Sequence, residues 1–143
     1  MNKREISDNT AGSLSAELVV LAPILLAIIF LFVFALRVER TSILIKSESR
    51  NAAQLASVAG SPTNASVLVS QHVNSELAQQ GVYCSNGAQI SINFSNYKPG
   101  GYVSVSVTCN VSLSDLGIPI SGGTVTETST STAPIDPYVT VTG

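Results

Sequence analysis

The most informative stretch of the chain is residues 18–36, which reads LVVLAPILLAIIFLFVFAL. None of its 19 residues carries a charged or strongly polar side chain. As a helix this stretch measures about 28 Å, close to the ~30 Å hydrocarbon core of a bilayer. Arg37, Glu39 and Arg40 end it abruptly. The stretch therefore predicts a membrane-spanning helix. Pro23 predicts a kink in it, because proline removes one backbone hydrogen bond.

The composition of the whole chain favours a membrane-linked protein over a soluble enzyme. Only 11% of its 143 residues are charged, against about 25% in an average soluble domain, and the mean hydropathy is +0.36. A net charge of −2 with seven scattered Lys and Arg excludes a generally basic nucleic-acid binder. One His and two Cys leave little material for a metal site. We expect no metal, no cofactor and no small-molecule substrate.

Enzymatic activity is not expected either. The sequence contains no P-loop, no nucleophile elbow, no Gly-rich dinucleotide fingerprint and no Cys–His pair at motif spacing.

A cleaved secretory signal is the first alternative for the apolar run. Such signals have an apolar core of roughly 7–15 residues followed by a small-residue cleavage site. Residues 18–36 are longer than this, and Ala35-Leu36-Arg37 is a poor cleavage site. We therefore expect the segment to remain in the mature protein.

Helical spacing continues beyond the apolar run. Ile45, Ala52, Ala56 and Ala59 recur on one face, and polar residues are expected to occupy the rest of the surface; these are Lys46, Glu48, Ser49, Arg50 and Gln54. Because no Gly or Pro interrupts residues 37–59, a continuous helix from residue 13 to about residue 59 is expected, ~70 Å long.

A second, shorter helix should follow the break at Gly60-Ser61-Pro62. Ser61 is a suitable N-cap with Pro62 at the first helical position, and Gly81 is a suitable stop after residues 63–80. Its apolar face is predicted to contain Ala65, Leu68 or Val69, His72 or Val73, and Leu77. His72 has no partner at ligand spacing, so we expect it on the helix surface and not as a metal ligand.

The spacing of apolar residues changes after Gly81, from the helical period of 3.6 residues to the strand period of 2. Apolar and polar residues alternate over residues 88–94 and again over 103–113, with a turn at 96–101, which predicts an antiparallel hairpin. Bends are expected at 116–119 and 122–123, and a third strand over 124–132. Pro134 and Pro137 restrict the C-terminal residues to a sheet edge or a tail. We interpret the Ser/Thr-rich end as such an edge rather than as an adhesive stalk.

Two cysteines, Cys84 and Cys109, bear on the compartment. In the cytosol they would be buried thiols, whereas outside it they would form a disulfide that closes a loop of about 25 residues and contributes about 3 kcal/mol. A count of Lys and Arg places the C-terminal side in the cytoplasm. The cysteine pair and the Ser/Thr/Asn-rich surface favour the outside, and we adopt that orientation.

The residues just before the apolar run form a short motif. Gly12 is followed by Ser13 and then by Glu17, which directly precedes the run. This spacing resembles the processing site of type IV pilins and pseudopilins, in which a membrane peptidase cuts after the glycine. Residues 1–12 resemble a prepilin leader. The resemblance implies that the mature chain begins at Ser13 and that a prepilin peptidase is a partner.

Glu17 is the acidic residue to which this resemblance gives a role. It would be the fifth residue of the mature chain and would take part in processing recognition. In a filament its carboxylate would pair with the α-amino group of a neighbouring subunit. An unpaired charge in that apolar setting is penalised, so the pairing would fix one axial register.

The whole layout resembles the TadE-like pseudopilins of tight-adherence (Flp-type) pilus systems. The likeness rests on the motif from Gly12 to Glu17, the run containing Pro23, the Ala-rich helix end at residues 51–53, and the strands at 103–113 and before 136–138. It implies a minor subunit used in assembly, initiation or tip adhesion of a pilus. The alternative is an unprocessed, single-pass membrane-anchored binding module.

The predicted organisation has three parts: a leader at residues 1–12, a spine helix at 13–60 with its transmembrane part at 18–36, and a small α+β domain at 61–143. The fold class is α+β, with a long apolar helix, a second short helix and an antiparallel sheet of about three strands. The expected location is the bacterial cytoplasmic membrane, with the C-terminal domain outside or on a surface pilus. The expected partners are the peptidase, other pilin subunits, the pilus assembly platform and membrane lipid.

Overall fold

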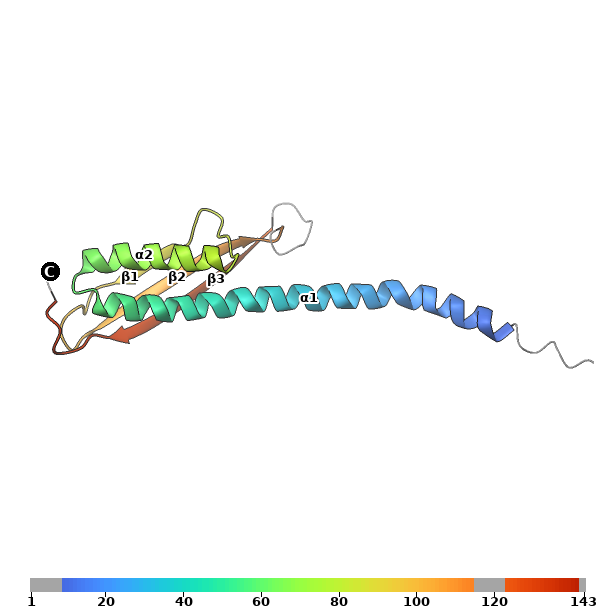
Figure 1. Cartoon of the computed structure of the whole chain (residues 1–143), viewed down its shortest axis with the longest axis horizontal. Coiled ribbons are helices and arrows are strands. Elements are labelled where there is room, and N and C mark those ends of the chain that lie inside the picture. The colour runs from blue at the N-terminus through green and yellow to red at the C-terminus, as the bar shows by residue number, and fades with distance from the viewer. Residues whose placement is uncertain (1–8, 115–122, 142–143) are drawn as a thin grey trace, which may run out of the picture. The chain divides into compact units, whose positions relative to one another are not determined.

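The computed structural model of the protein describes residues 9–114 and 123–141, and the side chains from residue 18 onward. It contains helices α1 (Asn9–Val58) and α2 (Pro62–Gln79) and strands β1 (Gln89–Asn93), β2 (Tyr102–Ser112) and β3 (Thr124–Pro134) (Figure 1). The strands form one antiparallel sheet in the order β1-β2-β3. The expected α+β fold is therefore confirmed. Residues 1–8 of the predicted leader and the predicted bend at 116–119 lie outside the described residues, as does Gly122 of the bend at 122–123.

Two compact units divide the chain, Met1–Leu36 and Arg37–Gly143. We call the second one the head unit. Helix α1 is continuous through the division, so its C-terminal half, from Arg37 to Val58, belongs to the head unit. The predicted spine is thus one helix that serves two units.

The second helix follows its sequence signals closely. Ser61 is the N-cap, and its side-chain oxygen accepts a hydrogen bond from the backbone N–H of Asn64 at 3.3 Å. Pro62 occupies the first turn, where its missing N–H costs no helical bond. Gly81, at φ +71°, follows the end of the helix. Of the alternatives predicted for its apolar face, Val69 is buried and not Leu68, and Val73 is buried and not His72. The buried residues therefore recur every four positions: Ala65, Val69, Val73 and Leu77.

Strand β2 is the centre of the sheet and supplies the core. Its inward residues alternate along the strand and are all buried, namely Val103, Val105, Val107, Cys109 and Val111. They pack with the buried faces of α2 and of the second half of α1, which contributes Ile45, Ala52, Ala53 and Ala56. Alanine at these positions lets helix and sheet approach closely. Of the residues expected on one face of this half of α1, Ile45, Ala52 and Ala56 are buried and Ala59 is half-buried.

The opposite face of the sheet carries hydroxyl groups in place of apolar side chains. Facing residues on β2 and β3 form three hydroxyl pairs, Ser104–Thr132, Ser106–Thr130 and Thr108–Thr128, with oxygens 2.6–2.9 Å apart. A fourth contact joins Thr126 to the side-chain oxygen of Asn110 at 2.6 Å. Cross-strand pairs of this kind stabilise a sheet face that remains in water. Both helices therefore cover the apolar face of the sheet, and the hydroxyl-bearing face is left uncovered by them.

The turn at residues 96–101 is held against the end of α1. The hydroxyl of Tyr97 donates a hydrogen bond to the carbonyl of Ala56 at 2.8 Å. Burial raises the pKa of Tyr97 above its ordinary value, and a backbone hydrogen bond with Gly60 opposes this rise. Gly101 is required in the turn, because a Cβ there would overlap the carbonyl oxygen of Asn96.

A disulfide closes the sheet at the other end. Cys84 forms an isolated bridge with Val111 and is bonded to Cys109 of β2, with the two Cα atoms 5.1 Å apart. The pairing expected for an extracytoplasmic domain is therefore present in the structure.

Replacing both cysteines, Cys84→Ala with Cys109→Ala, should lower the free energy of unfolding of the head unit by about 3 kcal/mol, because the 25-residue loop then opens in the unfolded chain. Urea titration of the full-length chain in detergent micelles, followed by circular dichroism, measures the change. Reductant should destabilise the wild type by a similar amount and leave the double variant unchanged. Equal stability of the oxidised wild type and the variant would contradict the prediction.

Candidate functional site

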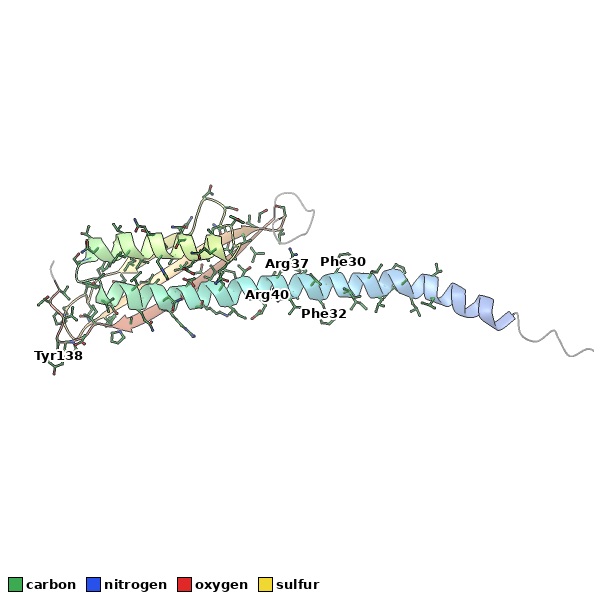
Figure 2. All side chains as sticks on the ribbon, in the orientation of Figure 1. Phe30, Phe32, Arg37, Arg40 and Tyr138 are labelled. Carbon is green, nitrogen blue, oxygen red and sulfur yellow. A yellow bond between two sulfur atoms is a disulfide. The ribbon has the colours of Figure 1, made fainter. Side chains whose placement is uncertain are left out.

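The N-terminal unit presents an apolar helix surface that is not covered by any described part of the chain. Its most apolar 18-residue window has a mean hydropathy of 3.2 and no buried residue. Leu18 and Phe30 are 68% and 72% exposed. Phe30 and Phe32 project from α1, and Arg37 and Arg40 follow them along the helix (Figure 2). A fully apolar helix surface of this length needs lipid or other helices around it, so this segment is a candidate membrane anchor.

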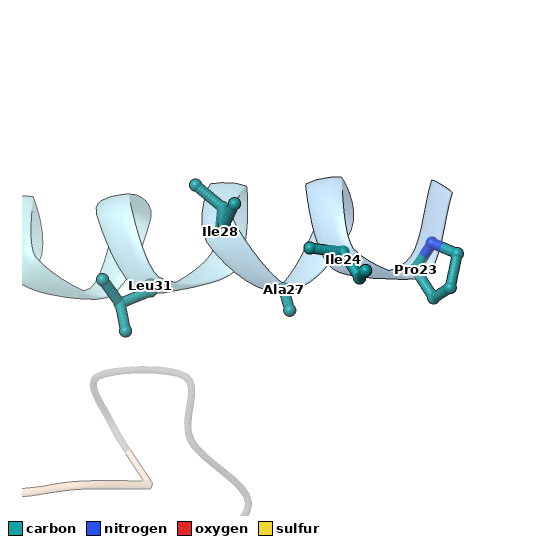
Figure 3. A pocket seen from close by; sticks show the side chains of 5 residues that line it. All are labelled: Pro23, Ile24, Ala27, Ile28 and Leu31. Atoms are coloured by element: carbon teal, nitrogen blue, oxygen red, sulfur yellow. The ribbon is translucent and has the colours of Figure 1, made fainter. Parts of the chain in front are cut away.

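Pro23 lies inside α1 without ending it. Its ring nitrogen has no hydrogen to donate to the carbonyl of residue 19, one turn earlier. Beside it lies a shallow hollow of about 430 Å³, lined by Pro23, Ile24, Ala27, Ile28 and Leu31. Figure 3 shows the short side chain of Ala27 between the larger neighbours. These residues recur at spacings of three and four, so the hollow lies along one face of the helix.

The residues of the predicted processing motif all lie within the first turns of α1. The helix begins at Asn9, so that Gly12, Ser13 and Glu17 have helical backbone. Their side chains lie outside the described part of the chain. The roles given to Gly12, Ser13 and Glu17 by the resemblance therefore stay predictions.

A buried acidic residue in the head unit departs from the sequence-based expectation. The helical pattern assigns Glu48 to the polar surface of α1, but it is only 3% exposed. One of its carboxylate oxygens, Oε2, has no hydrogen-bond partner among the described residues and lies 3.7 Å from Nε2 of His72 on α2. The other accepts a long hydrogen bond of 3.5 Å from the side chain of Asn51. His72 is half-buried and lies at the helix surface as expected, but it faces this carboxylate.

Ser49 is also expected on the polar surface and is fully buried instead. Its hydroxyl donates to the carbonyl of Lys46 at 3.0 Å. It also contacts the hydroxyls of Ser129 and Ser131 on β3, each at 2.9 Å. One donor and two acceptor positions on Ser49 can satisfy all three contacts. Ser49 therefore joins α1 to β3 through hydrogen bonds, where a water-facing side chain was expected.

The signal that locates both residues is present in the sequence. Positions 45, 48, 49, 52 and 56 share one helical face by spacing alone. Glu48 and Ser49 are nevertheless expected to be exposed, because Glu and Ser in a helix usually face water. Their partners on α2 and β3 are distant in the sequence and become visible only in the fold.

Within residues 9–114 and 123–141 no group of His, Cys, Asp and Glu is arranged to hold a metal ion. Comparisons of the chain with protein-family models, curated proteins and solved structures find no match. The chemistry of the molecule must therefore be argued from its own residues.

The Glu48–His72 contact gives a test of the buried carboxylate. His72→Ala should destabilise the head unit by about 1–3 kcal/mol, since it leaves a buried acidic group without its facing partner. Glu48→Met, which removes the buried charge at similar volume, should be close to neutral or stabilising.

The double variant should then be more stable than His72→Ala alone, and urea titration of all four proteins measures this double-mutant cycle. His72→Asn serves as a control that keeps a polar side chain at the position. Strictly additive effects of the two substitutions would show that Glu48 and His72 do not interact.

Proposed function

We propose that the chain is a minor pseudopilin of a tight-adherence type IV pilus system. In this proposal a prepilin peptidase cuts it after Gly12, the apolar half of α1 holds it in the cytoplasmic membrane, and the head unit lies outside. The mature subunit, beginning at Ser13, then takes part in assembly, initiation or tip adhesion of a pilus.

The observation that carries the proposal is the continuity of α1. A single helix of 50 residues joins the Gly12–Glu17 motif, the apolar segment and the core of the head unit. A leader that is cut before such a helix leaves the anchor attached to the head. A secretory signal that is cut after the apolar run would instead break α1 where it enters the head unit, near Arg37.

Two further features support the outward orientation and the filament role. The head unit contains a disulfide, and disulfides persist in oxidising compartments outside the cytoplasm. The hollow beside Pro23 and Ala27 offers an apolar surface at which a helix of another subunit can pack. In that setting the Glu17 carboxylate would pair with the amine of a neighbouring Ser13.

Intact-mass measurement of the full chain, produced in bacteria with and without a prepilin peptidase, tests the processing step. With the peptidase the mass should correspond to a chain beginning at Ser13. Gly12→Leu should keep the leader, because the side chain obstructs the cleaved bond. Glu17→Gln should lower the processed fraction, whereas the matched control Glu39→Gln, beyond the apolar run, should be processed like the wild type.

A wild-type chain that retains residues 1–12 in the presence of the peptidase would contradict the proposal. The remaining interpretation would then be the unprocessed, membrane-anchored binding module.

A further inference from the structure

Strand β3 is an edge of the sheet along its whole length. It pairs with β2 from Thr124 to Pro134 without interruption. On its other side, no backbone hydrogen bond to β3 is present within the described parts of the chain. An exposed strand edge of eleven residues is a template on which another strand can pair.

The register shows which backbone groups point away from the sheet. The N–H of Leu113 donates to the carbonyl of Gly123, and the N–H of Ile135 donates to the carbonyl of Gly101, both at 2.9 Å. These bonds lie at the two ends of the β2–β3 ladder and fix its alternation, so the odd-numbered residues of β3 bond to β2. The outward groups therefore belong to the even-numbered residues, which are Thr124, Thr126, Thr128, Thr130 and Thr132.

This edge carries little of the usual protection against pairing. Proteins protect edge strands with lysine, proline, bulges, inward-pointing charges or a covering element, and of these only one inward-pointing charge, Glu127, lies within the strand before its last residue. Here the register is unbroken, no lysine occurs in β3, and its proline, Pro134, stands at the last position. Glu127 is the strand's one charged residue, and it lies on the inward-facing set. Five successive outward positions are threonine, a residue that favours extended backbone.

A groove runs beside the C-terminal part of this edge. It has a volume of about 340 Å³ and is lined by Arg50 and Gln54 of α1 and by residues 131–134. Arg50 is exposed, and within the described residues it forms no ion pair and no side-chain hydrogen bond. A strand added to β3 would place its inward side chains next to this groove. The guanidinium there fits a carboxylate.

We propose that β3 is a docking edge for an extended strand of a different protein chain, one that carries an acidic side chain placed to reach Arg50. Main-chain hydrogen bonds with Thr126, Thr128 and Thr130 would provide the pairing, and Arg50 would select for the charge. The docking edge lies within the head unit and does not depend on processing after Gly12, whereas the choice of a different chain rests on the proposed anchoring of α1 in a membrane.

The geometry favours a different chain over a second copy. Two β3 edges that pair antiparallel in one continuous sheet reverse the direction of one head unit, so the two α1 helices would enter from opposite ends. Two subunits anchored in one membrane cannot be arranged in this way. A copy in the same direction, with its helices on the same face, offers only β1. On β1 the same alternation leaves only Ile90 and Ile92 with backbone N–H and C=O groups that point away from the sheet.

Thr128→Pro separates pairing at the free edge from stability of the sheet. Proline at this outward position removes an N–H that points away from β2, as Pro134 does at the end of the same strand. The matched control Thr128→Val keeps the N–H and removes only the hydroxyl. Urea titration verifies that each variant retains the fold of the head unit.

The probe is a fluorescent peptide, acetyl-TVTVEVTVT-amide, added to the full-length chain in detergent micelles, with a second peptide that has lysine in place of glutamate. Fluorescence anisotropy should show binding of the glutamate peptide. Thr128→Pro should weaken this binding at least tenfold and Thr128→Val less than threefold. Arg50→Glu should reverse the preference between the two peptides.

Amide hydrogen exchange of the wild type gives a second readout that needs no variant. The bound glutamate peptide should slow exchange at Thr126, Thr128 and Thr130 and leave exchange in the turn at 96–101 unchanged. No binding to the folded chain, or binding that Thr128→Pro does not weaken, would overturn the proposal. Self-association that Thr128→Pro abolishes, seen by sedimentation without peptide, would also overturn it in favour of a second copy.

Discussion

The structure depends on a single constraint, that α1 must satisfy two environments along one continuous helix. Residues 18–36 of its first half are apolar on every side, and none of the 18 residues in the most apolar window is buried against the described parts of the chain. Its second half has one buried face that contains Ala52, Ala53 and Ala56, and an exposed remainder that includes most of its charged side chains. No Gly or Pro separates the halves, so the change of environment is set by side chains alone. Arg37, directly after the apolar run, marks the point where it occurs.

The head unit is built on the small-residue face of this helix. Ala52, Ala53 and Ala56 are buried, and the same half of α1 is joined by hydrogen bonds to β3 through Ser49. Charged side chains are scarce on the opposite face of the sheet, where hydroxyl pairs line the two long strands. A sheet with one apolar and one hydroxylated face needs only one layer of helices. This explains how so short a chain closes a core.

The sequence predicts most of this architecture because its patterns are local. Strict alternation in β2 and the Ser61–Pro62 start of α2 specify their elements without reference to the rest of the chain. Burial of Glu48 and Ser49 is not predicted, because it depends on His72, Ser129 and Ser131, which reach α1 only in the folded head unit. The edge position of β3 is predicted from its Ser/Thr-rich composition and the prolines that follow, and the strand order confirms it. The register that leaves its even-numbered backbone groups unpaired follows only from the fold. The motif at Gly12 and Glu17 remains a prediction from sequence.

The most direct test of the account is the membrane topology of the full chain. In bacterial spheroplasts the protein should resist carbonate extraction, because α1 is proposed to span the bilayer. Protease added from outside should digest the head unit while cytoplasmic proteins remain intact. A head unit that is protected until the spheroplasts are lysed, or a chain that carbonate releases from the membrane, would contradict an outward-facing subunit anchored by α1.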